Sequence, residues 1–494
     1  MAAHFPIVII DPSDDVGIAL RALEAGEAVA PDVKTAEPIP AGHKVALKAV
    51  AAGEPVRKYG FPIGRARVAI APGEHVHSHN LATALTAHEA YSFHPKPAAA
   101  PASGPAQTFD GYLRPDGRVG TRNEIWILCT VGCVARTAQR IAEDANRRFA
   151  GRVDGVYALT HPFGCSQLGD DLAGTRAIIA ALASHPNAGG VLILGLGCES
   201  NQLDPLLKMV HPVGPDRLIA LSAQALDDEI EAGIEAVQTL VERAEQDRRT
   251  PRPLSDLTIG LKCGGSDGLS GLTANPLVGR IADKVTAAGG GAILTEIPEI
   301  FGAETLLMER AADRATFDAI GALVNDFKAY FTRHGEPVSE NPSPGNIAGG
   351  ITTLEEKSLG AVQKAGRGIV TQVLRYGEAV HGPGVALLES PGNDAVSSTA
   401  LAAAGATVIL FTTGRGTPLG FPAPTLKLST NSALAERKPR WIDFDAGPIA
   451  LGQSLDEAAG ALMDLVLDTA SGKTTRAEQN GEREIAIWKR GVTL

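Results

Sequence analysis

Residues 189–202 read GGVLILGLGCESNQ, an apolar run that ends in glycine, cysteine and polar residues. A continuous apolar run of this length is typical of a β-strand that is buried on both faces of a parallel sheet. Runs of the same kind stand at 124–131, 155–161 and 217–222, and helical segments separate them. This alternation predicts an α/β domain with a largely parallel sheet over residues 108–250.

The same alternation starts again after a charged, proline-containing stretch near 245–255. Apolar strand-like runs follow at 257–265, 292–297, 385–390 and 407–414. They predict a second α/β domain over residues 251–494, with a helical and loop insertion around 302–350.

The first ninety or so residues have a different pattern, with short β-like runs between glycine and proline turns. We expect a small, mostly β domain over residues 1–93, with one helix at 14–26. Residues 94–107, HPKPAAAPASGPAQ, are rich in proline and alanine without periodicity, and they predict a flexible linker.

The overall composition of the chain argues against several classes of function. A chain of 494 residues with 44% hydrophobic and 20% charged residues is an ordinary globular protein of several domains. The net charge of −11, without a basic stripe, argues against nucleic acid as a partner. No apolar stretch approaches the length of a membrane span, which argues against a membrane protein. Five cysteines are few and odd in number, which favours a reducing cytoplasm over a disulfide scaffold.

Chemistry is expected at the strand ends, because ligands bind beyond the carboxyl ends of strands in open parallel sheets. Seven predicted strands end in small, polar or thiol residues, and four of the five cysteines stand there: Cys133, Cys165, Cys198 and Cys263. Thiolates bind iron or zinc, although small residues that fill tight turns are an equal alternative. Cys129 lies inside an apolar strand and is expected to be a packed core residue.

A glycine-rich loop and an arginine are candidates for holding an anionic substrate. The loop at 263–268 offers the backbone amides of Gly264, Gly265, Ser266 and Asp267 to a carboxylate. Arg415, between two glycines, suits two-point capture of a carboxylate, although a surface arginine is the alternative. Candidate acids, bases or metal ligands are Asp170, Asp171, Asp267, Glu296 and Glu299.

The stretch GEHVHSHNL at 73–81 places His75, His77 and His79 at alternate positions. In a β-strand these three imidazoles would share one face. Such a face suits a divalent transition metal, whereas a polar strand edge without a ligand role is the plain alternative.

Taken together, the motifs resemble those of the altronate/galactarate dehydratase family, from end to end of the chain. HVHSHN at 75–80 favours the altronate branch of that family. The motifs that carry the resemblance are KYGFPIG (58–64), HVHSHN (75–80), DGRVGTRNE (116–124), GCSQLGDD (164–171), GLGCESNQ (195–202), CGGSDGLSGLTANP (263–276), ENPSPGNIAGGITTLEEKSLG (340–360), SPGNDAVSSTALA (390–402), TTGRGTP (412–418), WIDFDAG (441–447) and REIAIWKRGVTL (483–494).

The resemblance implies a β-clip domain of the SAF type at 1–93 and the dehydration of a sugar acid, D-altronate, to 2-dehydro-3-deoxy-D-gluconate. It also implies Fe²⁺ or Mn²⁺ as cofactor. We expect His75, His77 or His79 to hold this metal or to deliver a proton. The cysteine loops, with an iron–sulfur cluster, are the alternative site.

Chemical roles follow from this reaction, because a very weakly acidic C2 proton must leave and the C3 hydroxyl must depart. His161 and Glu296 are candidates for proton transfer. Arg415, the loop at 263–268 and Asn346 of the NPSPGN motif are candidates for binding the substrate.

Two other functions stay open on the sequence. One is a related lyase that acts on galactarate, another aldonate or sulfolactate. The other is a protein that binds sugar acids without turning them over. A homodimer is the expected assembly, since symmetric dimers are the commonest oligomers.

Overall fold

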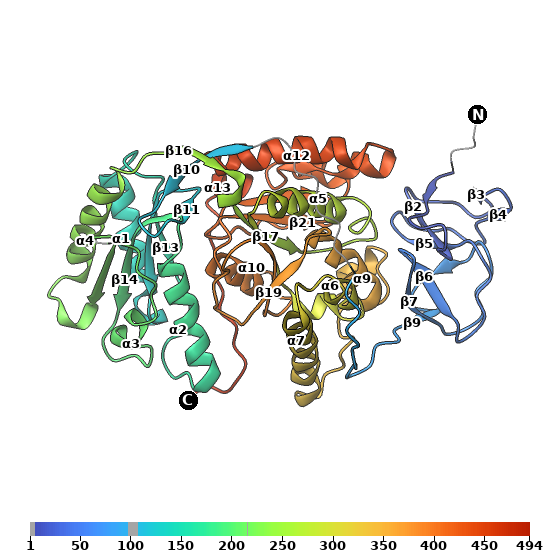
Figure 1. Cartoon of the computed structure of the whole chain (residues 1–494), viewed down its shortest axis with the longest axis horizontal. Coiled ribbons are helices and arrows are strands. Elements are labelled where there is room, and N and C mark those ends of the chain that lie inside the picture. The colour runs from blue at the N-terminus through green and yellow to red at the C-terminus, as the bar shows by residue number, and fades with distance from the viewer. Residues whose placement is uncertain (1–4, 97–106, 215) are drawn as a thin grey trace.

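The structure is a computed structural model that describes residues 5–96, 107–214 and 216–494. It has a strand-rich N-terminal region and two α/β units, so the predicted fold class is confirmed (Figure 1). The predicted linker at 94–107 falls mostly on residues 97–106, which lie outside the described residues. No helix in the described part of the chain is long and apolar enough to cross a membrane.

The N-terminal region is built from short antiparallel strands. One sheet has the order β1-β2-β5-β8 and another β6-β7-β9, with a separate β3-β4 pair. Their bounds are β1 (Ile7–Val8), β2 (Val16–Ala19), β3 (Ala28–Ala30), β4 (Val33–Lys34), β5 (Lys44–Ala46), β6 (Pro55–Lys58), β7 (Phe61–Ala66), β8 (His75–Val76) and β9 (Leu81–Ala82).

The helix predicted over 14–26 is wrong. Residues 16–19 form β2, which pairs with β1 on one side and with β5 on the other, and all four residues are buried. Long-range strand pairing therefore overrides the short helical pattern of this segment.

The first α/β unit has a four-stranded parallel sheet of order β13-β12-β14-β15. Helices α1 and α4 pack on one face, and α2 packs on the other, against the second unit. Cys129 is fully buried in this core, as predicted. The bounds are β12 (Glu124–Cys129), β13 (Val156–Leu159), β14 (Ala188–Gly195), β15 (Leu218–Ser222), α1 (Ala135–Arg148), α2 (Gly169–Ala183), α3 (Leu203–Leu207) and α4 (Glu229–Ala244).

The second α/β unit has a seven-stranded parallel sheet of order β19-β20-β18-β17-β21-β22-β23. Its strands are β17 (Thr258–Cys263), β18 (Gly291–Leu294), β19 (Val370–Leu374), β20 (Gly384–Leu388), β21 (Val408–Thr413), β22 (Thr425–Ser429) and β23 (Phe444–Asp445). Its helices are α5 (Ala274–Ala287), α6 (Thr305–Met308), α7 (Arg314–Arg333), α8 (Pro344–Ala348), α9 (Leu354–Ala361), α10 (Asp394–Ala403), α11 (Ser432–Arg437), α12 (Leu455–Ala470) and α13 (Arg476–Gln479).

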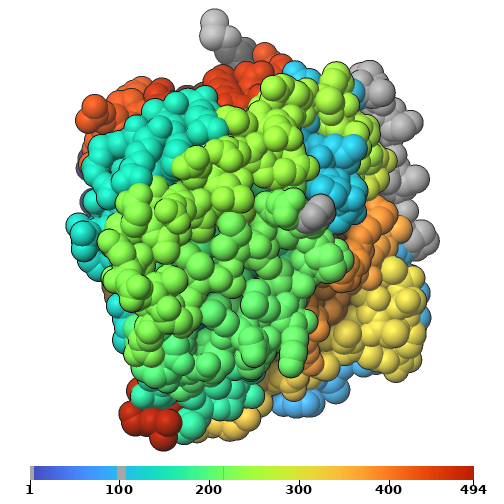
Figure 2. All heavy atoms as spheres, turned by 90° about the vertical axis from the view of Figure 1, so that its left-hand side faces the viewer, coloured from blue at the N-terminus to red at the C-terminus, as the bar shows by residue number. Residues whose placement is uncertain are grey.

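The two α/β units are joined through a small antiparallel sheet and through the end of the chain. The sheet has the order β11-β10-β16 and consists of β10 (Thr108–Leu113), β11 (Val119–Gly120) and β16 (Thr250–Pro253). At the opposite side, Leu494 N donates to Ser166 O, and Thr493 pairs with Gln167. Figure 2 shows this C-terminal segment, in red, beside the first α/β unit.

The N-terminal region docks on the second unit through a buried group of charges. Glu356, in α9, accepts hydrogen bonds from Lys44 Nζ (2.9 Å) and Lys58 Nζ (2.7 Å), and all three side chains are buried. Because breaking such a group leaves an uncompensated buried charge, it fixes the strand-rich region in one position over α8 and α9.

Candidate active site

The carboxyl edge of the seven-stranded sheet carries a buried group of a thiol and two carboxylates. Cys263 ends β17, Glu296 follows β18, and Glu299 lies in the 3₁₀ turn Ile297–Ile300. Among the described residues, this is the group of three metal-type side chains whose ligand atoms all lie within 4.8 Å of one another. Glu296 has a φ of 66°, a left-handed conformation that costs a non-glycine residue about 1–3 kcal/mol. The fold therefore holds the backbone of Glu296, which carries this carboxylate, in a strained conformation.

Two lysines bind the Cys263–Glu296 pair. Lys364 Nζ lies 2.7 Å from Cys263 Sγ and 3.3 Å from Glu296 Oε2. Lys262 Nζ bonds to Glu296 Oε1 and, at 2.8 Å, to Asp394 Oδ1. All of these nitrogen atoms are buried, so the carboxylates compensate their charges directly.

A third lysine connects Glu299 to the NPSPGN loop. Lys357 Nζ, from α9, donates to Glu299 Oε1 and Asn341 Oδ1, both at 2.9 Å, and to Asn346 Oδ1 at 3.2 Å. Asn346 Nδ2 in turn donates to Ser266 O at 2.8 Å. Asn346, predicted to bind substrate, thus ties the glycine-rich loop to the charged group.

The two carboxyl groups have opposite proton affinities. Burial, reinforced by Glu299, raises the pKa of Glu296. Burial also opposes ionisation of Glu299, but Lys357 and the other lysines overcome it and lower its pKa to about 2. Burial, with Glu296, raises the pKa of the Cys263 thiol to about 12, so this thiol stays protonated at neutral pH. One carboxylate can therefore exchange a proton while its neighbour stays charged.

The glycine-rich loop lies under the N-terminal region and beside Arg415. Gly265 has a positive φ of 63°, and a Cβ on Gly268 would lie 1.9 Å from Gly42 O, so both positions favour glycine. Arg415 is exposed, and its Cδ would lie 3.8 Å from a Cβ on Gly345 in α8. The loop, α8 and Arg415 therefore converge at one place, as the substrate-binding prediction requires.

Asp267 has a different role from the proton-transfer candidates. Its buried carboxylate accepts hydrogen bonds from the side chains of Thr430, Ser270 and Asn431 and from the Leu269 amide. Burial nevertheless raises its pKa. The carboxylate therefore orders the loop. The amides of Gly264 and Asp267 already donate to Thr412 O (3.0 Å) and Ser270 Oγ (2.9 Å), so of the four predicted amides those of Gly265 and Ser266 remain for an anion.

Four histidines gather where the N-terminal region meets α8. The rings of His75, His77 and His79 lie together, with centroids 5.2 Å (His75–His77) and 5.7 Å (His75–His79) apart. The fourth ring is that of His43, which stacks on His77 at 5.0 Å. Burial lowers the pKa of His43 and His77 and lowers that of His75 to about 3, so these rings are neutral at neutral pH.

The backbone reason for this gathering differs from the prediction. A single strand through all three histidines is wrong, because β8 ends at Val76 and residues 77–80 form a turn. Asn80 holds the turn by accepting from His77 N (2.9 Å) and donating to His75 O (2.9 Å). The turn nevertheless keeps the rings on one side.

The remaining cysteines and His161 belong to the other sheet. Cys133, Cys165 and Cys198 are exposed at loops beyond the four-stranded sheet, whereas Cys263 is buried at the seven-stranded one. The sequence predicts that the four cysteines share one sheet edge, but the structure places them at the edges of two different sheets. His161 is buried, with Nε2 2.9 Å from Cys129 O and Nδ1 accepting from Phe163 N, and burial lowers its pKa. Both ring nitrogens are engaged, which favours a structural role in its loop.

Three regions of the chain match known protein families. Residues 5–84 match the family described as "Altronate/galactarate dehydratase SAF domain", and residues 111–245 match "D-galactarate dehydratase/Altronate hydrolase, second domain". Residues 254–493 match "D-galactarate/Altronate dehydratase, C-terminal". The chain belongs to the altronate/galactarate dehydratase family. The predicted resemblance is thus confirmed.

Individual members of the altronate/galactarate dehydratase family match this chain over nearly its whole length. It is 49% identical to altronate dehydratase of Escherichia coli (strain K12), over 97% of this chain and 98% of that protein. It is 48% identical to altronate dehydratase of Bacillus subtilis (strain 168), over 98% and 99%. It is 34% identical to galactarate dehydratase (L-threo-forming) of E. coli, over 94% and 92%. The chain is therefore a member of a family of sugar-acid dehydratases.

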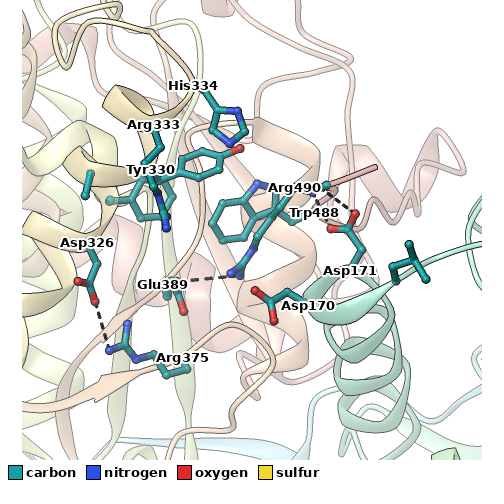
Figure 3. Close-up of a pocket in the computed structure, with 14 residues that line it drawn as sticks. Asp170, Asp171, Asp326, Tyr330, Arg333, His334, Arg375, Glu389, Trp488 and Arg490 are labelled. Atoms are coloured by element: carbon teal, nitrogen blue, oxygen red, sulfur yellow. Dashed lines mark hydrogen bonds and ion pairs between the residues drawn. The ribbon is translucent and has the colours of Figure 1, made fainter. Parts of the chain in front are cut away.

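A large cavity of this family member is lined by other residues than the Cys263 group and the four N-terminal histidines. It has a volume of about 680 Å³ and lies between α2, α7 and residues 488–491 (Figure 3). Asp170 and Asp171, two predicted candidate acids, line it. The carboxylate of Asp171 accepts hydrogen bonds from the backbone amides of Arg490 (2.6 Å) and Gly491 (2.9 Å), so it anchors the end of the chain. The ion pairs that line the cavity, Arg375–Asp326 (3.6 Å) and Arg490–Glu389 (4.0 Å), are exposed or partly exposed, whereas the acids and lysines of the Cys263 group are almost all buried.

Several residues of the Cys263 group and of the histidine group were not predicted. They are His43, Lys262, Lys357, Lys364 and Asp394. Lys262 had one signal, a charge inside an otherwise apolar strand run, where a buried lysine needs a partner.

Proposed function

We propose that this chain is a hydro-lyase that converts D-altronate to 2-dehydro-3-deoxy-D-gluconate and water. The observation that carries the proposal is the near-complete match, at 49% and 48% identity, to two altronate dehydratases. The galactarate dehydratase is more distant, at 34% identity, which favours altronate over galactarate.

The metal that the family resemblance implies fits the histidines better than the Cys263 group. At the Cys263 group, Lys262, Lys357 and Lys364 already bind the ligand atoms, and the thiol stays protonated. A divalent cation would add charge where three ammonium groups already stand. This contrast supports a proton-transfer role for the Cys263 group.

The histidine group has the donor chemistry for Fe²⁺ or Mn²⁺. Burial lowers the pKa of His43, His75 and His77, so these three rings are neutral, and neutral imidazole is the form that binds a transition metal. We propose that this group holds the metal and that His75, whose ring lies against the other three, is one of its ligands. When bound, it would supply a positive charge for the substrate's carboxylate and hydroxyl oxygens.

The protein's own side chains divide the remaining work. Arg415 and the amides of Gly265 and Ser266 bind the carboxylate and orient C2. Glu296 takes the C2 proton, because its raised pKa makes it the better base of the two carboxylates. Lys357, between Glu299 and Asn346, is the candidate that protonates the departing C3 hydroxyl.

A substrate panel tests the proposed function. Metal-loaded protein would be incubated with D-altronate, galactarate, other aldonates and sulfolactate, and formation of 2-keto-3-deoxy acid would be followed. We expect the highest kcat/KM with D-altronate. A preference for another acid would assign a related lyase, and binding without turnover of any acid would assign a binding protein.

Metal and sulfide analysis tests the cofactor. Protein purified without oxygen would be assayed for iron, manganese, zinc and acid-labile sulfide. We expect about one metal per chain without sulfide, since the histidines form one group. Several irons with matching sulfide would instead place a cluster on the loops of Cys133, Cys165 and Cys198, whose thiols are exposed at one sheet.

We also propose that the protein works in the cytoplasm as a homodimer. The five cysteines are all free thiols, which supports a reducing compartment. Sedimentation of the purified protein tests the dimer, and a monomer mass would reject it.

A further inference from the structure

We infer that His43 and His75 together bind one divalent transition-metal ion, on the face of the N-terminal region that meets α8. The observation that points to it is the approach of two ring nitrogens, His43 Nδ1 and His75 Nε2, to 3.0 Å. His43 lies outside the HVHSHN motif, so this assignment adds a ligand that the motif does not contain. It rests on the proposed function only in locating the metal at this face.

The separation of the two nitrogens fits two ligands of one ion. Imidazole nitrogens lie about 2.0–2.1 Å from such a metal, so two ligands at right angles are about 3.0 Å apart. A nitrogen pair also selects the class of ion, because imidazole suits zinc, copper, iron or nickel rather than magnesium or calcium. Cobalt, which binds the same kind of site, is a suitable probe.

The hydrogen bond of His43 Nε2 leaves the lone pair of Nδ1 available to a metal. His43 Nε2 lies 3.3 Å from the carbonyl oxygen of Ala348, which can only accept, so Nε2 carries the proton. The lone pair of Nδ1 then faces His75. A backbone carbonyl that fixes the ring and its tautomer in this way is the usual outer support of a metal-binding histidine.

The other two histidines have different surroundings. His77 Nε2 lies 3.1 Å from Ile347 O and its Nδ1 lies 3.1 Å from Ser78 Oγ, so both nitrogens of this ring have protein partners. His79 is exposed, and its ring lies 5.7 Å from that of His75. His43 and His75 are therefore the convergent pair, and the rings of His77 and His79 flank them.

His43 lies beside the docked interface. Its neighbour Lys44 donates to Gly350 O, Thr352 Oγ1 and Glu356 Oε2, and a Cβ on Gly268 would lie 1.9 Å from Gly42 O. The stretch 42–44 is thus pressed against the C-terminal unit. Both ligands belong to the N-terminal region, so the ion would lie beside the interface, and the C-terminal unit supports it through the Ala348 carbonyl oxygen that fixes the His43 ring.

Cobalt binding by the full chain tests the pair. Co²⁺ would be titrated into metal-free protein and followed by visible absorption and by calorimetry, for the wild type and for His43→Gln and His75→Gln. Glutamine keeps a polar side chain near Ala348 O, and circular dichroism would confirm the fold. His88→Gln, at an exposed histidine of the same region, is the matched control.

We expect both variants to bind Co²⁺ about tenfold more weakly or worse, with a changed visible spectrum, while His88→Gln binds like the wild type. Wild-type binding by His43→Gln would overturn the pair and leave a histidine–histidine hydrogen bond. Wild-type binding by His75→Gln would overturn it as well. Because the readout is metal affinity, failure of altronate turnover would reject the proposed function without touching this inference.

Discussion

The two parallel sheets end in similar sequences but in different surroundings. The four-stranded sheet ends in loops with exposed thiols at Cys133, Cys165 and Cys198. The seven-stranded sheet ends in buried Cys263, two carboxylates and three lysines, under α8, α9 and the N-terminal region. What covers a strand end, rather than the strand end itself, therefore decides whether its residues are solvated or have strongly shifted pKa values.

Replacing one buried glutamate at each sheet edge should give the largest difference in activity between the two edges. We expect Glu296→Gln to lower kcat with D-altronate by about 10²–10⁴-fold, because the group that takes the C2 proton is lost. Glu199, which accepts from Thr130 and from the Gly197 amide at the other edge, is the matched control. Steady-state kinetics should show Glu199→Gln within about tenfold of the wild type; equal losses would mean that both edges take part.

Removing a charge from the docked interface should lower the stability of the protein more than removing one from an exposed ion pair. Glu356→Gln leaves Lys44 and Lys58 buried without an anion, and we expect a loss of about 3–5 kcal/mol in the free energy of unfolding. Denaturant unfolding measures this loss. The control Glu231→Gln, at the exposed Arg148 pair between α1 and α4, should leave the midpoint unchanged. A wild-type midpoint in Glu356→Gln would contradict the docking role of this buried charge group.

The same carboxylate sets a pH dependence of stability. Although burial opposes its ionisation, Lys44 and Lys58 lower the pKa of Glu356 to about 2 from an ordinary value of 4.5. A lowered folded-state pKa contributes stability above the unfolded pKa and loses it as pH falls through the folded pKa. Wild-type stability should therefore decline between pH 4.5 and about 2, and the decline should be shallower in Glu356→Gln. Parallel curves for the two proteins would assign the acid loss to other groups.

Thiol labelling gives the smallest but cleanest contrast. Iodoacetamide should modify Cys133, Cys165 and Cys198 in the folded protein and spare Cys129 and Cys263, which are buried. Burial raises the pKa of each of these two thiols to about 12, so neither offers a thiolate. Peptide mass spectrometry reads the pattern, with unfolded protein as the control for full labelling. Rapid modification of native Cys263 would contradict its buried position.

Much of the fold was readable from the sequence, because buried parallel strands leave continuous apolar runs such as 189–195. Cys263, Glu296 and Glu299 were also predicted, since they stand at the end of β17 or in the segment that follows β18. Lys357 and Lys364 were missed, because a lysine in a helical segment ordinarily faces solvent. Their burial depends on tertiary packing that no local pattern records.

His43 was missed for a related reason. It precedes His75 by 32 residues, and only the antiparallel pairing of β5 with β8 brings the two together, with Val45 opposite His75. The three motif histidines were correctly expected to gather, although a turn rather than an extended strand gathers them. Alternation alone does not distinguish these two backbones when a strand is only two residues long.

The central claim is that side chains at the buried edge remove the C2 proton of D-altronate and that an enol then becomes a ketone. Nuclear magnetic resonance of the reaction in D₂O tests it most directly. The account predicts 2-dehydro-3-deoxy-D-gluconate with one solvent deuterium at C3, formed by wild-type protein and lost in Glu296→Gln. No product from D-altronate, or product without deuterium at C3, would contradict it.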